Sequence, residues 1–431
     1  MTQQWVRHEA FDGDHVSKRE SSVFRPGRMS TTTTRIEISY RTFEGSQMAE
    51  IGSQAPPKML AVGLDATRAA SFIKAAFLDG IFLTSPENVY YTTGYPCVPG
   101  AGNPILHSLH NQLPAFAYLD STGSRTLLCW GFSTLGVTYD AESLLGYEDF
   151  QGALQAINTL VKDKLTTASR IGIESSCPKY VLDILGEVGL PMDRLMVVDD
   201  LIYDLRIVKS PAEIELCKAS LQMAEDCLEE LLATLSIGQS RRELLRFARQ
   251  RLAELGATGI SHLTISLGRE NPEVAVDEIA KGDSLVTLDV GAILDGYISD
   301  CRRYAYLGNP PTEVVELHEA MIEAVETVAR ALQPGTPYSE LYGIAKDFMI
   351  KSDITGHEWL SHVGHSIGLE TEEDWLDNRN DRYLHEGMVV AVELYTITSQ
   401  LQPIGNEETY LIGADGPQRL TRLPAALRCI A

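Results

Sequence analysis

The sequence predicts two folded domains, an α/β domain over residues 56–203 and an α+β domain over residues 204–431, behind an extension of residues 1–55. Three observations predict this arrangement. The length of 431 residues suits two domains. Short apolar runs bounded by turn residues alternate with helical periods in the first domain, and long amphipathic helices alternate with strands in the second. The extension is polar, with little apolar periodicity, so we expect it to be partly disordered.

The first domain is predicted to be a sheet with helices on its faces. Residues 64–80 have the spacing of a helix that ends at Gly80, and residues 152–165 predict another helix. Four short apolar runs between turn residues predict strands, and they read IFLT, AFAYLD, RTLLCW and RIGIE.

A helix-start signal marks the beginning of the second domain. Ser210 is a candidate N-cap, Pro211 occupies the first helical position and Glu213 completes a capping box. This helix is expected to run to about Leu235. Further predicted helices cover 240–255, 311–332 and 338–351. The strands expected between and after the helices read LVTLDVGAIL, YISDCRRYAYL, GMVVAVELY and EETYLIG.

Composition and charge narrow the classes of protein. Lysines and arginines number 36 against 59 acidic residues, which gives a formal net charge of −23. Nucleic-acid and anionic-membrane partners need a basic footprint and are not expected. No apolar run of ~18 residues predicts a transmembrane helix, and the first residues hold no apolar signal core. Seven scattered cysteines without a CxxC pair are typical of a cytoplasmic protein, which is the location we expect.

Two aspartates in the stretch Thr287–Tyr306 are the first candidates for chemistry. Asp289 lies on one predicted strand and Asp300 on the next, with Asp295 and Gly296 as the hairpin turn between them. Eleven residues apart across a short hairpin, the two carboxylates can face each other from adjacent strands. A buried facing pair repels unless a cation or a proton lies between the two groups.

Three later residues extend the aspartate pair to a set typical of metal ligands. His365 lies in the glycine-flanked run SHVGHSIGLE, Glu393 lies in GMVVAVELY and Glu407 begins EETYLI. Two aspartates, one histidine and two glutamates suit Mn, Fe, Co or Zn, and they do not suit a thiolate zinc site. Each residue alone would more often be structural, but this order within one half of the chain indicates metal ligands.

The same residues resemble the pattern of the pita-bread metallohydrolases, a family that includes Xaa-Pro aminopeptidase, prolidase, methionine aminopeptidase and creatinase. That pattern has an Asp in a D-x-G strand, a second Asp eleven residues on, a His in a glycine-rich run and two strand glutamates. The segments ENVYYTTGY, LRIVKSPAEIE, KGDSLVTLDVG and ALQPGTPYSEL are also similar to the creatinase–prolidase branch, so the resemblance covers about residues 60–425.

The resemblance implies a creatinase-like N-terminal domain and a pita-bread C-terminal domain. It also implies one or two divalent ions, with Mn expected first and Fe, Co or Zn as alternatives, and a homodimer or higher homo-oligomer. The implied metal ligands are Asp289, Asp300, His365, Glu393 and Glu407.

The chain departs from the peptidases of this family at three histidines. Those histidines hold the peptide carbonyl and move protons, and two of their positions are Ser361 and Glu372 here. The third has no counterpart, because residues 268–288 contain no histidine. His362, which is shifted by one position, and His262 are spare candidates. These losses argue against proline-peptide hydrolysis.

Arg302 is a further departure, because the family usually has Thr at this position. By strand alternation Arg302 shares a face with Asp300, so it can bind an anionic substrate group at two points or crowd one of two metal positions. A surface ion pair is the third interpretation. Other candidates for substrate binding are Arg379 and the loop histidines His107 and His110, which could reach a neighbouring subunit's site. Arg303, Arg379 and Arg382 are further candidates for an anion pocket beside the metal, although each is expected to be exposed to solvent.

Together these features predict a metal-dependent hydrolase of a small anionic, non-peptide substrate. A divalent cation lowers the pKa of bound water towards ~7. The candidates for proton transfer and charge stabilisation are Glu372, His362 and Arg302. Within the family the chain looks most like 5-nitroanthranilate aminohydrolase, so release of ammonia from an aromatic amine is the first hypothesis. The alternatives are an Xaa-Pro peptidase, another small-molecule C–N hydrolase similar to ectoine hydrolase, and a non-catalytic binding module.

Overall fold

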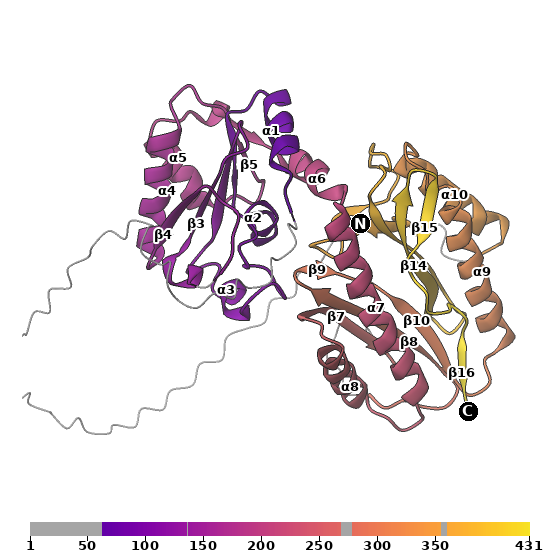
Figure 1. Cartoon of the computed structure of the whole chain (residues 1–431). Coiled ribbons are helices and arrows are strands. Elements are labelled where there is room, and N and C mark those ends of the chain that lie inside the picture. The colour runs from indigo at the N-terminus through magenta and orange to yellow at the C-terminus, as the bar shows by residue number, and fades with distance from the viewer. Residues whose placement is uncertain (1–62, 136, 269–277, 355–359) are drawn as a thin grey trace, which may run out of the picture. The chain divides into compact units, whose positions relative to one another are not determined.

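The computed structural model describes residues 63–135, 137–268, 278–354 and 360–431 (Figure 1). The predicted extension, residues 1–55, lies outside the described residues. Within the described ranges, no helix combines the length and the apolar character that a membrane crossing requires.

The first domain is a six-stranded mixed sheet with the strand order β4-β3-β2-β1-β5-β6. β1 runs antiparallel to β2 and parallel to β5, and Figure 1 shows α4 and α5 together beside the sheet, where α4 also contacts β3 and β4. The strands are β1 (Gly80–Leu83), β2 (Phe116–Asp120), β3 (Arg125–Trp130), β4 (Ser143–Tyr147), β5 (Ile171–Ile173) and β6 (Leu195–Val197). The α-helices are α1 (Ala66–Ala75), α2 (Pro86–Thr93), α3 (Pro104–Ser108), α4 (Phe150–Lys164), α5 (Lys179–Glu187) and α6 (Asp199–Ile207), with short 3-10 turns at Gly131–Thr134 and Met192–Arg194.

The predicted elements of this domain are present, and the differences lie at helix ends and in short elements. The helix expected over 64–80 ends at Ala75, because Phe77 adopts a left-handed backbone with φ of 56°. The structure adds α2, which begins after its N-cap Ser85 and ends at Gly94, whose φ is 68°. Its eight residues are too few for a helical period to stand out in the sequence.

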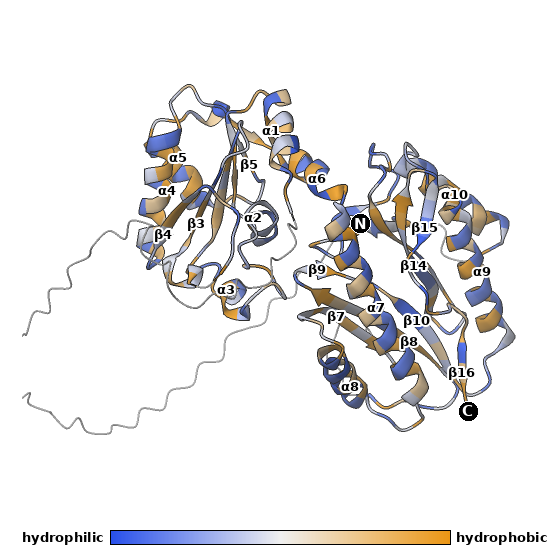
Figure 2. Ribbon diagram, viewed as in Figure 1, coloured by the Kyte–Doolittle hydropathy of each residue, from blue (hydrophilic) through white to orange (hydrophobic). Residues whose placement is uncertain are grey.

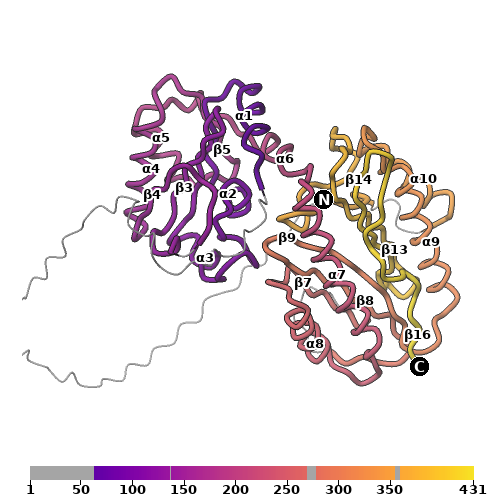
Figure 3. Tube along the Cα trace, viewed as in Figure 1, coloured from indigo at the N-terminus to yellow at the C-terminus, as the bar shows by residue number. Residues whose placement is uncertain are grey.

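The second domain contains two sheets. One has the order β16-β10-β8-β7, with β9 paired to β8, and the other has the order β12-β11-β13-β14-β15. The first sheet consists of β7 (Gly259–Ser266), β8 (Ser284–Leu294), β9 (Tyr297–Ile298), β10 (Arg302–Leu307) and β16 (Arg428–Ile430). The second consists of β11 (Gly364–Ser366), β12 (Asp374–Trp375), β13 (Val389–Ile397), β14 (Pro403–Gly413) and β15 (Gly416–Arg419). Figure 3 follows the chain through both sheets.

Each sheet of the second domain is covered by its own pair of helices. α7 (Pro211–Thr234) packs on β8 and α8 (Arg241–Glu254) on β7, whereas α9 (Thr312–Ala329) packs on β13 and β14 and contacts α10 (Tyr338–Lys351). Two separate apolar cores lie beneath these helix pairs. Figure 2 shows polar and apolar residues on different parts of α7 and α9, as expected for helices that cover a sheet with one side.

Two local predictions in the second domain are confirmed. The Ser210 amide donates to Glu213 Oε2 (2.7 Å) and the Glu213 amide donates to Ser210 Oγ (3.3 Å), which completes the capping box of α7. Asp295 and Gly296 have φ of 47° and 86° and join β8 to β9. Positive φ at both central residues is what a two-residue type I′ hairpin turn requires.

A buried ion network ties the segment between the domains to the second domain. Glu373 accepts from Lys209 Nζ (2.7 Å) and from Arg206 Nη2 (2.6 Å), and its side chain is 4% exposed. Arg206 also donates to Asn88 of α2 (3.0 Å). Burial would raise the pKa of Glu373, but Lys209 and Arg206 lower it to about 2. Glu373 therefore remains ionised and compensates two buried cations.

We expect Glu373→Gln to lower the free energy of unfolding by about 3 kcal/mol at pH 7, because it leaves two buried cations without their anion. The folded-state pKa of Glu373 is depressed. Its contribution is therefore present above the unfolded pKa of ~4.3 and is lost as the pH falls through about 2. Urea denaturation at pH 7 and pH 3 should show the difference falling to about half at the lower pH.

Glu370→Gln is the matched control. Glu370 also pairs with Arg206 (2.8 Å), but its side chain is 49% exposed. An exposed ion pair contributes at most about 1 kcal/mol, so this variant should differ little from wild type at either pH. Equal losses in the two variants would contradict a special role for the buried carboxylate.

Candidate metal centre

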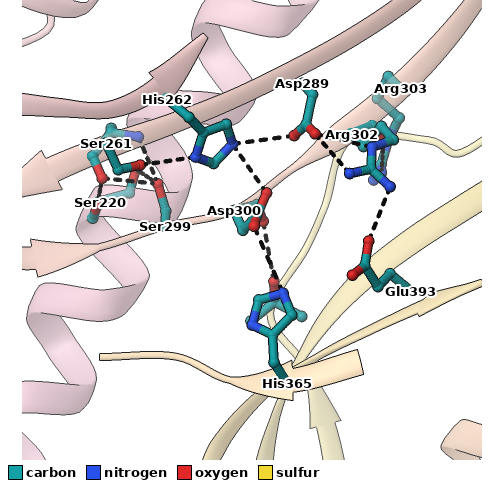
Figure 4. Close-up of polar contacts among 12 residues, drawn as sticks. Ser220, Ser261, His262, Asp289, Ser299, Asp300, Arg302, Arg303, His365 and Glu393 are labelled. Atoms are coloured by element: carbon teal, nitrogen blue, oxygen red, sulfur yellow. Dashed lines mark hydrogen bonds and ion pairs between the residues drawn. The ribbon is translucent and has the colours of Figure 1, made fainter. Parts of the chain in front are cut away.

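The five predicted ligands come from strands of both sheets in the second domain and are buried. β8 carries Asp289, the residues before β10 carry Asp300, β11 carries His365, β13 carries Glu393 and β14 carries Glu407. Figure 4 shows four of these side chains pointing toward a common region from both sheets. Residues up to 118 positions apart in the chain therefore meet, as 407 − 289 = 118.

Strand register positions the residues on the first sheet. β8 and β10 pair so that Asp289 lies directly opposite Arg302, and directly opposite residues project their side chains on the same face. Asp300 lies two residues before Arg302 and therefore shares that face. The hairpin turn predicted from the sequence sets this register, because a shift by one residue would send every side chain to the other face.

Strand register also positions the residues on the second sheet. Glu393 on β13 lies directly opposite Glu407 on β14, and His365 on β11 lies opposite Ala391. Like charges directly opposite each other on a sheet are destabilising unless a cation lies between them. Gly364, with φ of 136°, precedes His365, and an added Cβ would lie 2.0 Å from the carbonyl oxygen of Ala391. Only glycine lets β11 approach β13 so closely.

His262 joins the site, although the sequence offered it only as a spare candidate. Its Nε2 lies 3.2 Å from Asp289 Oδ1 and 3.2 Å from Asp300 Oδ1, and its Nδ1 lies 3.0 Å from Ser261 Oγ. A β-bulge in β7 re-aims the strand at this residue. Gly291 makes room for the ring, since an added Cβ would lie 2.4 Å from His262 Cε1. Gly291 is the glycine of the D-x-G motif, and it is the feature of the sequence that could have indicated a ring packed against β8.

Arg302 binds two of the predicted ligands. Its Nε and Nη2 donate to Asp289 Oδ2 (3.0 and 2.8 Å), and its Nη1 donates to Glu393 Oε2 (2.9 Å) (Figure 4). Both carboxylates are buried, so the surface ion pair considered from the sequence is wrong. Binding of a substrate anion at two points would need the same N–H groups, which already donate to the protein's own carboxylates. The geometry supports the other prediction, that Arg302 crowds one of two metal positions.

Asp300, His365 and Glu407 form a buried group that fits a metal ion. One donor atom from each lies within 4.8 Å of the others, and His365 Nε2 lies 3.7 Å from Asp300 Oδ2. Both carboxylate oxygens of Glu407 are buried and have no hydrogen-bond partner among the described residues. Buried polar atoms without a partner are costly. Two carboxylates and an imidazole are ordinary ligands for a divalent transition ion.

The pKa shifts of the carboxylates follow from these contacts. Burial would raise the pKa of Asp289, but Arg302 and His262 hold it well below its usual range. Burial and the neighbouring carboxylates raise the pKa of Asp300 and, further, that of Glu407. Burial would also raise the pKa of Glu393, but the neighbouring Arg302 guanidinium lowers it below its usual value. Asp300 and Glu407 are therefore the two carboxylates whose negative charge the protein's own groups compensate least.

His362 and Trp375 line the neighbourhood of the cluster. His362 Nδ1 lies 4.0 Å from Glu393 Oε1 and is buried, with no hydrogen-bond partner among the residues that the structure describes. Its ring packs on Trp375 with 4.1 Å between ring centroids, and Trp375 also meets His365 edge-on at 5.6 Å. Burial lowers the pKa of His362, which favours the neutral imidazole. Trp375 could not be predicted as a site residue, because no sequence motif marks it.

The other predicted residues lie elsewhere. Glu372 is exposed in the turn before β12. The Arg379 side chain is 80% exposed and donates to Asp377. His107 in α3 and His110 stack on each other at 5.4 Å between centroids. No described contact links these four residues to the cluster, so their predicted roles in proton transfer and substrate binding find no support in position.

Two arginines that were expected to be exposed are not. Arg303 is 1% exposed and donates to the Glu407 carbonyl (2.9 Å), because it points to the opposite face of β10 from Arg302. Arg382 lies over the ring of Tyr203 at 3.8 Å and pairs with Asp204. Arg382 also lines a cavity of about 650 Å³, as does Trp375. Its other lining residues include Arg206, Glu373, Asp377 and Arg379.

The sequence is similar to known metallopeptidases. Residues 215–414 match Metallopeptidase family M24, and residues 66–208 match the Creatinase/Prolidase N-terminal domain. An Xaa-Pro dipeptidase of Pyrococcus horikoshii is 26% identical over 361 residues, which cover 81% of this chain and 95% of that protein. An Xaa-Pro dipeptidase of Pyrococcus furiosus is 26% identical over 359 residues, with the same two coverages of 81% and 95%.

Solved structures share the fold. A prolidase from Thermococcus sibiricus matches with a TM-score of 0.73 at 21% identity, over 85% of this chain and 98% of that one. An X-Pro aminopeptidase from Thermotoga maritima matches with a TM-score of 0.70 at 22% identity, over 85% and 99%. These matches confirm the predicted creatinase-like N-terminal domain and pita-bread C-terminal domain.

Gly291→Ala should weaken metal binding without unfolding the protein. The added methyl group would occupy the space of the His262 ring and displace it from Asp289 and Asp300, and loss of such an outer contact typically costs 10–100-fold in metal affinity. Titration of the metal-free protein with Co²⁺ measures the affinity. Gly343→Ala, in α10 with nothing within 4 Å of the added Cβ, is the control. Unchanged affinity in Gly291→Ala would show that His262 does not position the ligands.

Proposed function

We propose that this chain, which joins a Creatinase/Prolidase N-terminal domain to a metallopeptidase family M24 domain, is a metal-dependent hydrolase of Xaa-Pro dipeptides. The observation that carries the proposal is the buried group of Asp300, His365 and Glu407, with both oxygens of Glu407 unpartnered among the described residues. The similarity to the two Pyrococcus Xaa-Pro dipeptidases supports the substrate class. An Xaa-Pro peptidase, considered above as an alternative, thus becomes the first hypothesis.

The proposed ion is Mn²⁺, with Fe²⁺, Co²⁺ or Zn²⁺ as alternatives, and its proposed ligands are Asp300, His365 and Glu407. A divalent ion bound there would supply a Lewis acid and a water acidic enough to react near neutral pH. Arg302 holds the side chains of Asp289 and Glu393 in place at the edge of the group.

His362 is the proposed proton carrier in place of the missing peptidase histidines. Hydrolysis of Xaa-Pro adds the hydroxyl of water to the carbonyl carbon, breaks the C–N bond and adds a proton to the proline nitrogen. The His362 imidazole lies close to Glu393, and its Nδ1 has no hydrogen-bond partner among the described residues. It can take up a proton from the attacking water and release it to the leaving proline nitrogen. Trp375, packed on His362, would offer an apolar face to the proline ring.

Hydrolytic deamination of an aromatic amine is the second candidate. In this reaction the hydroxyl of water replaces a ring amino group, as in the conversion of 5-nitroanthranilate to 5-nitrosalicylate and ammonia. The observation that favours it is the exposed Ser361 and Glu372 at two positions where the peptidases of the family have histidines. A nitro group would accept the negative charge of the adduct.

The substrate assignment can be tested with the full-length chain loaded with Mn²⁺. We expect free proline from Xaa-Pro dipeptides, no cleavage of dipeptides without proline, and loss of activity on chelation that returning Mn²⁺ reverses. Release of ammonia and a salicylate-type product from 5-nitroanthranilate, with no proline released from any dipeptide, would select the second candidate. Inactivity on both substrate types despite bound metal would favour a binding module.

His362→Gln should lower kcat about 100-fold or more with less effect on KM, as expected for loss of a general acid–base group. His385→Gln is the matched control, because His385 is exposed on the loop before β13. Steady-state kinetics of both variants on the best dipeptide measure the effect. Wild-type kcat in His362→Gln would exclude His362 as the proton carrier.

We further propose at least a homodimer, in which the loop after Gly94 approaches the neighbouring subunit's site with His107 and His110. Light scattering of the purified chain reports the number of subunits.

A further inference from the structure

We propose that Arg302 permanently takes the place of a second metal ion, so that this chain binds one divalent ion rather than two. The ion would lie on Asp300, His365 and Glu407, and Asp289 would serve as a partner of Arg302 instead of a metal ligand. The inference rests on the metal dependence proposed above, but not on the identity of the substrate.

Backbone geometry places the guanidinium between the two sheets. Arg302 lies directly opposite Asp289 in the β8–β10 pairing, so its side chain leaves the strand on the same face as Asp289. From there it bridges Asp289 Oδ2 on one sheet and Glu393 Oε2 on the other (2.8 and 2.9 Å). A second cation bound to these two oxygens would have to displace the guanidinium.

The remaining oxygen of Asp289 is also engaged. His262 Nε2 lies 3.2 Å from Asp289 Oδ1, and the bulge in β7 and the missing side chain at Gly291 hold the ring in this position. Both oxygens of Asp289 therefore have protein partners. By contrast, both oxygens of Glu407 have none among the described residues.

The charges of the cluster agree with a single ion. Four carboxylates, Asp289, Asp300, Glu393 and Glu407, bring a formal charge of −4 to a region without bulk water. The Arg302 guanidinium supplies one positive charge that cannot be lost by deprotonation. One divalent ion reduces the remainder from −3 to −1, and a second would reverse its sign to +1, so a second ion would bring no further neutralisation. Buried charges of one sign are costly.

Metal counts on the full-length chain test the proposal. After chelation, the protein is dialysed against a range of Mn²⁺ concentrations and its metal content is measured by mass spectrometry. We expect one ion per wild-type chain and two per chain in Arg302→Thr, because the smaller side chain frees the oxygens of Asp289 and Glu393. Electron paramagnetic resonance should show an isolated Mn²⁺ signal for wild type and an exchange-coupled pair for the variant.

Two further variants show which carboxylate binds the ion, and they do so even if Arg302→Thr fails to fold. Glu407→Gln should weaken binding of the single ion at least tenfold, whereas Asp289→Asn should retain a count of one with less than threefold change in affinity. Circular dichroism and thermal unfolding establish that each variant is folded.

Several outcomes would overturn the proposal. These are two ions in wild type, no ion in wild type, one ion in a folded Arg302→Thr, or an affinity loss in Asp289→Asn as large as that in Glu407→Gln. The counts are made without substrate, so they are independent of the reaction. A chain that binds one ion and releases no proline would reject the proposed substrate and leave this inference intact.

Discussion

Four buried carboxylates that face one another between two sheets are the constraint on which the rest of this structure depends. Asp289, Asp300, Glu393 and Glu407 repel one another in a region with little water to screen them. The fold is compatible with them only if positive charge is held at the same place. Arg302 and His262 supply part of it from the protein itself, and the raised pKa values of Asp300 and Glu407 mark where it is still missing.

Strand register brings the four carboxylates together. On each sheet an antiparallel pairing places the carboxylates on the inner face, and two glycines allow the close approaches that the site needs. Gly291 leaves room for the His262 ring, and Gly364 lets the strand of His365 lie close against β13. Because register is set by turns and by burial of the opposite face against helices, the chemistry of the centre depends on the packing of the whole second domain.

The first domain is tied to the second through buried polar contacts. Arg206 links Asn88 on α2 to Glu373, which Lys209 also contacts, and Tyr90 donates to the Asp295 carbonyl in the turn between β8 and β9 (2.8 Å). That turn sets the register of the strand that carries Asp289. A contact of the first domain therefore reaches the turn next to the strand that carries Asp289 of the candidate site.

The sequence by itself determined the elements of this protein and the residues of its candidate site. Apolar period, the capping box at Ser210 and the Asp295-Gly296 turn are local signals, and the spacing of Asp289, Asp300, His365, Glu393 and Glu407 resembles a family pattern. Only the tertiary structure decided what neighbours these side chains have. Four features depend on contacts between segments far apart in the chain. They are the bridge that Arg302 makes between two carboxylates, the position of His262 beside Asp289, the packing of Trp375 on His362 and the exposure of Glu372. Charge and burial at a point in space are sums over such segments, so no local pattern in the sequence carries them.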